Sequence, residues 1–383
     1  MTITADDTAP GTPVLSVQDL AVHLPTEHGL LRAVDGVSFE VRAGQTLGIV
    51  GESGSGKSVT AKTLLRLNPA RFHESGTVRL HGADAPDGSD ALDLMELRAD
   101  GPMIRAVRGR RIAMIFQEPM TAFSPLHTIG DQIMEAILLH RTSDRAEARD
   151  ICLEWMLRVG IGDAERRIDQ YPHQFSGGMR QRAMIAMALS CEPEVLIADE
   201  PTTALDVTIQ AQVLELMQEL QEETGMAIVF ITHDLAVVAG MCDEVAVMYL
   251  GRIVEQAPVR ELFSSPQHPY TRGLLRSIPR LGMGRDERLH AIEGTVPQAI
   301  DLPPMCSFRD RCTARIEGVC ETAEPRLLEL TGHHHVRCFL HDPDAPEPDR
   351  LVGSAASEPA RASAAVTASA VPGTPAHPEE SPA

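Results

Sequence analysis

Eight consecutive residues near the start of the chain have the types and order needed to hold nucleotide phosphates. Residues 51–58 read Gly-Glu-Ser-Gly-Ser-Gly-Lys-Ser and fit the pattern G-x-x-x-x-G-K-[ST] in full. The glycines let backbone N–H groups face a phosphate, Lys57 would neutralise the β- and γ-phosphates, and the Ser58 hydroxyl would bind Mg²⁺. The residues predicted to bind ATP in this loop are Gly51, Ser53, Gly54, Ser55, Gly56, Lys57 and Ser58.

A pair of carboxylates could supply the second half of such a site. The apolar run 195–198 leads directly into Asp199 and Glu200, so a buried strand would present both at its tip. Asp199 suits the Mg²⁺ shell, and Glu200 is placed to polarise a water for attack on the γ-phosphate. Taken alone, the pair could equally be an ordinary end of a strand.

The elements that must position these residues are short and apolar. Residues 47–50 precede the phosphate loop and 59–65 follow it, which predicts a strand, a glycine turn and a helix. Ser176, Gly177 and Gly178, called the signature residues below, open a further helix and form a second anion-binding turn. Because the phosphate loop already binds the phosphates of one ATP, the second turn is free to bind the phosphates of another ATP.

Residues 175–182 resemble the signature sequence of ATP-binding cassette (ABC) proteins, with Phe175 where Leu is usual. The order of the other motifs agrees: Gln117 matches the Q-loop, residues 201–206 match the D-loop that ends at Asp206, and His233 matches the switch histidine. Without this order, Gln117 could simply begin a loop and His233 could be structural.

The resemblance implies an α/β fold, a P-loop NTPase cassette with a RecA-like core, an antiparallel β subdomain and a helical subdomain. It also implies that two cassettes meet head to tail, each closing its signature residues over the other's ATP. Gln117 and His233 would then sense the γ-phosphate and the attacking water, and Gln117 would join Ser58 and Asp199 around Mg²⁺.

Changes in composition along the chain predict its domains. Residues 1–12 are expected to be mobile, 13–262 to form the ATPase domain with a helical subdomain at about 120–190, and 341–383 to be a disordered tail. Residues 263–340 form what we call the C-terminal extension. Each ATPase motif occurs once, so a second chain is expected to complete the pair.

Charge and hydropathy narrow the function classes. The formal net charge of −20 argues against nucleic acid as a partner, because Lys and Arg dominate binding to a phosphate backbone. The sequence shows neither a secretory leader nor an apolar run of about 18 residues. We therefore expect the protein to stay in the cytoplasm, and the resemblance to transporter ATPases implies a peripheral position at the cytoplasmic face of the cell (inner) membrane.

Four of the seven cysteines cluster in the C-terminal extension: Cys306, Cys312, Cys320 and Cys338. Disulfides are disfavoured in a reducing cytoplasm, so the spacing favours a [4Fe–4S] cluster or Zn²⁺, with four unligated thiols as the alternative. The His run 333–335 could compete as ligands but is expected to be exposed. The remaining cysteines, Cys152, Cys191 and Cys242, are expected to be buried small hydrophobic residues.

Residues 171–182, 265–271 and 332–338 together resemble ATPase subunits of dipeptide and oligopeptide permeases, over roughly 13–340. The resemblance implies peptide import, an iron–sulfur cluster at the four cysteines, a second and different cassette polypeptide, two membrane permease subunits and an extracytoplasmic substrate-binding protein. Nickel or glutathione import, a homodimer, and a soluble non-transport ABC ATPase stay open.

Two further expectations concern contacts. The membrane subunits are expected to dock near Gln117 on a groove beside Pro119, Met120, Phe123 and Pro125, although these apolar residues could also be core. The adenine is harder to place, because the family often stacks it on an aromatic ring that is missing here. Leu24 and His28 are the closest candidates, which predicts weak stacking or apolar contact and modest discrimination between ATP and GTP.

Overall fold

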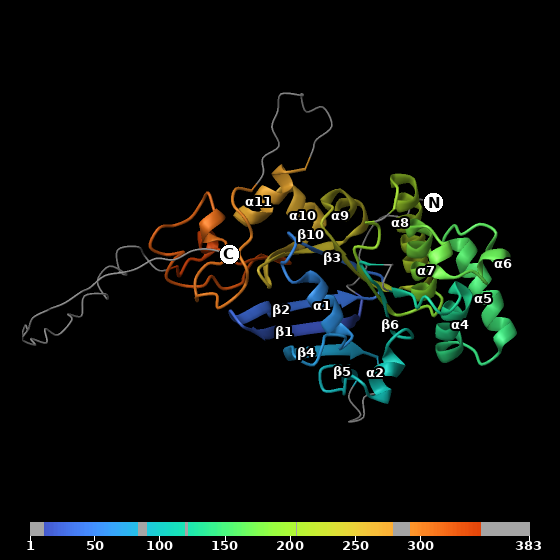
Figure 1. Ribbon diagram of the computed structural model, residues 1–383. Helices are drawn as coiled ribbons and strands as arrows, with labels where there is room; N and C mark the ends of the chain where they lie inside the picture. The colour runs from blue at the N-terminus through green and yellow to red at the C-terminus, as the bar shows by residue number, and fades with distance from the viewer. Residues whose placement is uncertain (1–10, 83–89, 119–121, 204, 279–291, 346–383) are drawn as a thin grey trace, which may run out of the picture. The chain divides into compact units, whose positions relative to one another are not determined.

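The computed structural model describes residues 11–82, 90–118, 122–203, 205–278 and 292–345. The expectations for residues 1–10, for the tail from 346 onward, and for Pro119 and Met120 lie outside the described residues. Within the described part, an α/β arrangement is built on two sheets (Figure 1).

The larger sheet has eight strands in the order β11-β12-β10-β9-β3-β8-β7-β6 among the described residues. Strands β3, β6, β7, β8 and β9 pair in parallel, and β10, β12 and β11 continue the sheet in antiparallel fashion. The bounds are β3 Thr46–Val50, β6 Ile112–Ile115, β7 Val195–Asp199, β8 Ala227–Thr232, β9 Glu244–Tyr249, β10 Arg252–Pro258, β11 Leu328–Thr331 and β12 His334–Val336.

The strands that carry the motifs are buried on both faces. Every residue of β3, β7 and β8 is buried, as expected for central parallel strands, which read as continuous apolar runs. Val50 lies beside Thr232, and Asp199 beside Ile231. Because parallel strands end at one edge of a sheet, the loops that follow them are brought together there.

The smaller sheet is antiparallel, in the order β2-β1-β4-β5. It consists of β1 Pro13–Thr26, β2 Gly29–Arg42, β4 His73–His81 and β5 Ala91–Asp93. Its buried side chains share one core with the larger sheet, including Leu20 and Val37 from the hairpin and Ile197 from β7. Strand β2 is at the edge of this sheet, which leaves one side of it available for another segment.

Helices flank both sheets and form a separate group after β6. The helices around the larger sheet are α1 Lys57–Leu64, α8 Val207–Thr224, α9 Leu235–Met241 and α10 Val259–Ser264, and α2 Pro102–Val107 lies beside β5 of the smaller sheet (Figure 1). The group drawn in green in Figure 1 comprises α4 Ile129–His140, α5 Arg145–Arg158, α6 Ala164–Arg167, the short helix η1 Pro172–Gln174 and α7 Gly177–Leu189. Its helices pack around Trp155, whose side chain is 2% exposed.

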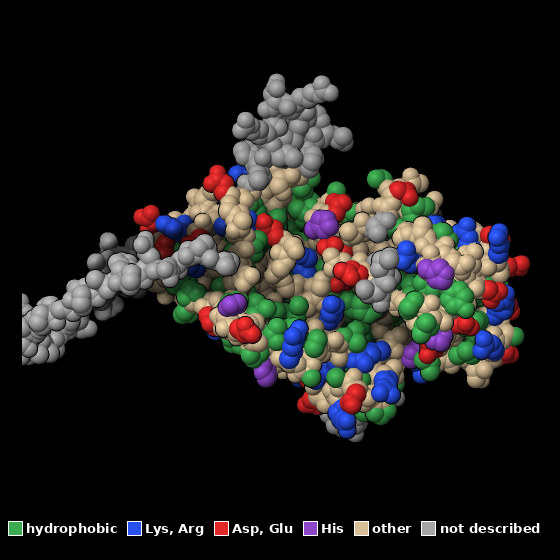
Figure 2. Space-filling model, in the orientation of Figure 1, with side chains coloured by type: hydrophobic (Ala, Val, Ile, Leu, Met, Phe, Trp, Pro, Cys, Tyr) green, Lys and Arg blue, Asp and Glu red, His purple; other side chains and the backbone are tan. Residues whose placement is uncertain are grey.

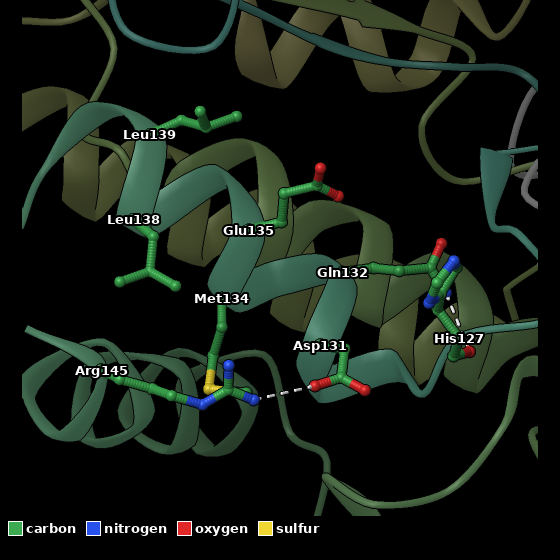
Figure 3. A pocket seen from close by; sticks show the side chains of 8 residues that line it. All are labelled: His127, Asp131, Gln132, Met134, Glu135, Leu138, Leu139 and Arg145. Carbon is green, nitrogen blue, oxygen red and sulfur yellow. Dashed lines mark hydrogen bonds and ion pairs between the residues drawn. The ribbon is translucent and has the colours of Figure 1, made fainter. Parts of the chain in front are cut away.

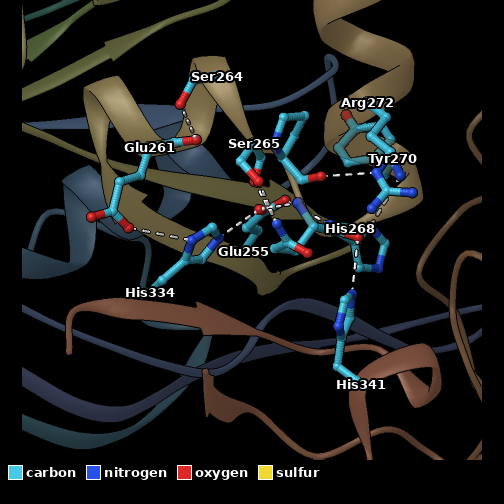
Figure 4. Close-up of polar contacts among 11 residues, drawn as sticks. Glu255, Glu261, Ser264, Ser265, His268, Tyr270, Arg272, His334 and His341 are labelled. Carbon is cyan, nitrogen blue, oxygen red and sulfur yellow. Dashed lines mark hydrogen bonds and ion pairs between the residues drawn. The ribbon is translucent and has the colours of Figure 1, made fainter. Parts of the chain in front are cut away.

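The C-terminal extension is joined to the larger sheet. It contains α11 Pro269–Arg276, η2 Arg309–Arg311, β11, β12 and η3 Phe339–His341. Strand β12 pairs with β10, so Val336 lies opposite Glu255. The Glu255 carboxylate is fully buried and accepts hydrogen bonds from the backbone of Gln267 (2.6 Å) and His268 (2.9 Å), with the His334 ring at 2.8 Å (Figure 4). His334 is thus buried, and the expectation that the whole His run is exposed was wrong.

Candidate functional site

The phosphate loop closes tightly around its lysine. The Lys57 ammonium donates to the carbonyls of Gly51 (2.7 Å) and Glu52 (3.0 Å), and burial lowers its pKa against the opposing pull of Glu200 and Asp199. Gly56 has φ +103° just before α1 begins, and a Cβ there would lie 2.2 Å from the Ala33 carbonyl oxygen. Only glycine fits this position.

The residues predicted to hold Mg²⁺ meet at the tips of α1 and β7. The Ser58 hydroxyl donates to the Asp199 carboxylate at 3.0 Å, and burial raises the pKa of that carboxyl group. A hydroxyl and a carboxylate are the hard oxygen ligands that Mg²⁺ prefers. Gln117, exposed at the start of the loop after β6, lines the same pocket and could add an amide oxygen. This donor set fits the ion.

Glu200 lies at the centre of a polar cluster. Its carboxylate accepts hydrogen bonds from Gln117 Nε2 (3.1 Å) and Thr203 Oγ1 (3.1 Å) and lies 3.2 Å from His233 Nδ1. Burial raises the pKa of Glu200, but the contacts with His233, Thr203 and Gln117 outweigh it and the pKa falls below its usual value. An ionised carboxylate that faces a γ-phosphate pocket can accept a proton from water.

The backbone at Glu200 is strained. Its φ is +51°, in the left-handed region that a non-glycine residue rarely adopts, and its N–H donates to the Ile231 carbonyl at 2.9 Å. Such strain costs about 1–3 kcal/mol and is found where surrounding structure fixes a functional side chain. The hydrogen bond to β8 supplies that fixation here.

The signature residues do not reach this pocket. Ser176 caps α7, where its hydroxyl accepts from the Met179 N–H at 3.3 Å, and both Ser176 and Gly177 are exposed. Asp206, also exposed, caps α8 by accepting from the Ile209 N–H at 3.1 Å. None of the signature residues is among the described residues that line the nucleotide pocket, and Asp206 is also absent from that lining. The anion-binding turn formed by Ser176, Gly177 and Gly178 therefore lies outside the pocket of its own chain.

The phosphate loop opens into a pocket of about 640 Å³. Its lining combines the phosphate loop, Gln117 and Glu200 with residues of the β1–β2 hairpin and part of the C-terminal extension. His28, which sequence reasoning proposed for the adenine, lines this pocket, whereas Leu24 is not part of the described lining. The extension residues in the lining are Val296, Pro297, Gln298, Ala299 and Ile300.

Sequence reasoning missed the contacts that the extension makes with the phosphate loop. Arg311 donates two hydrogen bonds to the Glu52 carboxylate, at 2.6 and 3.0 Å, and the Tyr270 hydroxyl accepts from the Glu52 N–H at 2.9 Å. Arg311 directly precedes Cys312, and its position beside a suspected ligand was the only signal available. Nothing in the sequence pairs it with a loop far upstream.

The four clustered cysteines differ in exposure but are all partly or fully buried. Burial raises the pKa of Cys306 to about 12 and that of Cys338 to about 11. The Cys306 N–H donates to the Cys320 carbonyl at 3.1 Å. Among the described residues, however, no group of three or more His, Cys, Asp or Glu side chains is arranged to hold a metal ion. The residues as placed do not fit an iron–sulfur cluster or zinc. The other three, Cys152, Cys191 and Cys242, are buried as expected.

The proposed docking groove needs a correction. Phe123 is 5% exposed and belongs to the core around Trp155, so it cannot face a partner. Pro125 is exposed, and so is the neighbouring Leu126, at 80%. No helix in the described part of the chain is long and apolar enough to cross a membrane.

Comparisons with known proteins agree with this geometry. The profile of the family described as "ABC transporter" matches residues 34–203, and that described as "Oligopeptide/dipeptide transporter, C-terminal region" matches 254–320. The chain is 52% identical over 327 residues to a probable peptide ABC transporter ATP-binding protein, y4tR, of Sinorhizobium fredii, covering 85% of this chain and 94% of the relative. It is 48% identical to the dipeptide transport ATP-binding protein DppD of Bacillus subtilis, covering 86% and 95%.

A solved structure supports the fold. The chain resembles a dimeric, post-hydrolysis state of the ATP-binding cassette MJ0796 bound to ADP and phosphate, with a TM-score of 0.56 and 25% identity. The match covers 64% of this chain and 99% of that one. The predicted cassette fold is therefore confirmed.

Proposed function

The chain belongs to the ATP-binding cassette transporter family, and on this premise we propose that it is the ATP-hydrolysing subunit that powers import of dipeptides or oligopeptides through a membrane permease. The observation that carries the proposal is that named peptide-transport ATP-binding proteins match it over almost their whole length, with 45–52% identity. The second profile, which matches 254–320, points to the same substrate class.

Hydrolysis is proposed to use the residues gathered at the strand tips. Lys57 and the first N–H groups of α1 hold the phosphates, and bound Mg²⁺, held by Ser58 and Asp199, would neutralise charge on the leaving group. Glu200 accepts a proton as water attacks the γ-phosphorus and the bond to the ADP oxygen breaks. Its pKa, lower than usual, keeps it ionised for this role. Gln117 and His233, both in contact with Glu200, would orient the water.

A second cassette is proposed to complete the site. Ser176 and Gly177 are exposed, Gly178 is half-buried, and none of the three lines the pocket of their own chain, which supports their use on a partner's ATP. The resemblance to a dimeric cassette adds support. We propose a different polypeptide as that partner. Purifying the complex from cells and identifying its subunits by mass would distinguish this from two copies of the same chain.

The membrane subunits are proposed to dock beside α4. A pocket of about 400 Å³ there is lined by Asp131, Met134 and Leu138 from α4 and Arg145 from α5, among others (Figure 3). On the face drawn in Figure 2, hydrophobic side chains lie among charged ones over these helices, and Leu139 is 70% exposed. Helix α4 comes after the Gln117 loop in the sequence. A membrane-subunit helix docked there could therefore respond when Gln117 moves with the γ-phosphate. The chain would then be peripheral, at the cytoplasmic face of the inner membrane.

The experiment that tests the transport function is ATP hydrolysis by the complex reconstituted with its membrane subunits and its extracytoplasmic binding protein. Hydrolysis should rise when peptide is added, and the rise should vanish in Glu200→Gln. Nickel and glutathione are the matched alternatives. Stimulation by either of these, with no response to peptides, would replace the proposed substrate while leaving the ATPase function in place.

An iron–sulfur cluster at Cys306, Cys312, Cys320 and Cys338 stays a proposal, supported by the clustering of the four thiols and by the resemblance to peptide-permease ATPase subunits. The described geometry does not favour it, since no metal-holding group is present there. Iron and sulfide analysis of protein purified without oxygen would decide. Cys312→Ser should lower both contents, and Cys191→Ser, which alters a buried thiol outside the group, should not. Zinc in place of iron would support the second candidate.

A further inference from the structure

The C-terminal extension forms one wall of the nucleotide pocket. Val296 and Ile300 are half-buried, Ala299 is 6% exposed, and all three line the same cavity as the phosphate loop. Leu31 and Ala33 from the edge strand β2 line the same pocket. This segment is far outside the stretch that carries the ATPase motifs.

Backbone pairing holds this wall in place. The Arg32 N–H donates to the Ala299 carbonyl at 2.8 Å, the Asp301 N–H donates to the Leu30 carbonyl at 3.0 Å, and Leu31 bridges Ile300 in antiparallel fashion. The Asp301 side chain returns a bond by accepting from the Leu30 N–H at 2.9 Å. The segment therefore adds to the open edge of β2 as a short strand would.

The hairpin is shaped for this approach. Gly29 has φ +126°, and a Cβ at that position would lie 1.9 Å from an Asp301 carboxylate oxygen. A larger residue would be strained at this φ and would push the Asp301 side chain away from the hairpin. The glycine at position 29 therefore allows the extension to pack closely against the hairpin.

The residues that would bind the phosphates indicate which part of ATP would contact this wall. Lys57 and Ser58 fix the phosphates, and Gln117 and Glu200 mark the γ-phosphate end. The opposite end is left for the ribose and base. It is lined by aliphatic side chains, with the imidazole of His28 as the one aromatic ring among the described lining residues.

We propose that the C-terminal extension supplies the nucleobase wall of the ATP site, with the base resting on one apolar surface formed by Leu31 of β2 and by Val296 and Ile300 of the extension, beside His28. The proposal rests on the ATPase function proposed above. It makes the extension a part of nucleotide binding, and the aliphatic contact takes the place of a stacking aromatic ring.

The test compares two ligands that share phosphates and differ in the base. Binding of Mg²⁺–ADP and of Mg²⁺–pyrophosphate to the full chain is measured by calorimetry. The double variant Val296→Ala, Ile300→Ala removes five methyl or methylene carbons from the wall and is expected to weaken ADP binding about tenfold. Pyrophosphate binding should change by less than about twofold, because it does not extend to this end.

Controls separate the possible failures. Leu328→Ala alters a half-buried residue of the same extension that does not line the pocket, and it should leave both affinities unchanged. If the double variant does not fold, Val296→Ala alone should weaken ADP binding about threefold. Unchanged ADP binding, or equal weakening for both ligands, would overturn the nucleobase wall. Failure of the unmodified chain to bind ADP would instead count against the proposed function.

Discussion

Arg311 and Glu52, 259 positions apart in the sequence, are joined by two parallel hydrogen bonds of 2.6 and 3.0 Å. The Arg311 side chain is 5% exposed, and its hydrogen bond to Glu52 raises its pKa further above the usual range. Glu52 is the second residue of the phosphate loop. The C-terminal extension thus holds the loop by its carboxylate and, through Tyr270, by its backbone.

Arg311→Ala should raise the KM for ATP severalfold and lower stability by about 1–2 kcal/mol, because it leaves the Glu52 carboxylate without its partner. Arg311→Lys should recover only part of both losses, since lysine keeps the charge but not the two-pronged contact. ATPase kinetics and urea unfolding measure the two effects. Arg311 is a positioning residue, so kcat should change less than KM. The charge swap Glu52→Arg, Arg311→Glu should restore part of the affinity, and a swap worse than either single variant would contradict the pairing.

Glu200→Gln should reduce kcat by about 10²–10⁴-fold while ATP binding is retained, because the amide cannot accept the proton of the attacking water. Glutamine can still accept hydrogen bonds from Gln117 and Thr203, so the cluster should persist. Single-turnover hydrolysis and nucleotide binding measured side by side check this. Asp144→Asn, which changes a carboxylate that caps α5 and is absent from the described pocket lining, is a matched control for loss of one charge.

The acid limb of the pH–rate profile should move when contacts to Glu200 are removed. Its pKa is lower than usual because the hydrogen bonds from His233, Thr203 and Gln117 outweigh the effect of burial. A lowered pKa keeps the carboxylate ionised as the pH falls, so activity is lost only at more acidic pH. Thr203→Val removes one donor, so the limb should shift to higher pH. If the acid limb does not move in this variant, a group other than Glu200 must be responsible for it.

Stability should fall on acidification through His268. Burial, with a smaller contribution from His341 and Arg272, lowers the pKa of His268 to about 3. Below about pH 6.5 the unfolded chain binds a proton that the folded chain refuses, so His268 reduces stability by up to about 1.4 kcal/mol per pH unit until pH 3. The loss is absent above the pKa of His268 in the unfolded chain, where the ring is neutral in both states. Urea unfolding at pH 7, 6 and 5 measures the slope.

His268→Asn is the matching variant for that slope. His268 caps α11, where its Nδ1 accepts from the Tyr270 N–H at 3.1 Å, and asparagine can make the same type of bond without titrating (Figure 4). Lost packing should lower stability at every pH, but the fall between pH 6.5 and 5 should be shallower than in the unmodified chain. An identical slope would assign the pH dependence to other groups.

Local patterns in the sequence were enough to predict that the phosphate loop and Asp199 lie together, and the structure brings them together. The run into Asp199 and the pattern 51–58 each specify a strand and a turn within a few residues, and parallel pairing then brings their ends together. Contacts between distant segments have no such signal. Neither Arg311 nor Val296 belongs to a local pattern that indicates a nucleotide, because their roles depend on pairing with β2 and the phosphate loop.

The burial of individual side chains was predicted least well where the polarity of the residue or of its neighbours suggested exposure. His334 is polar and lies in a histidine run, yet it is buried beside Glu255 because β12 adds to the larger sheet. Phe123 follows a proline-containing loop and was expected to be able to face a partner, but it fills the core around Trp155. In both cases the tertiary environment, which sequence spacing does not encode, decided the outcome.

The pairing between Leu30 and Asp301 also has a consequence for how the molecule is made. A ribosome must add 271 further residues after Leu30 before its partner exists. Until then the edge of β2 is bare and the pocket lacks one side. A nascent or truncated chain can therefore carry every ATPase motif and still lack the residues at 296–300 that line the pocket. The order of synthesis makes this wall the last part of the pocket to form.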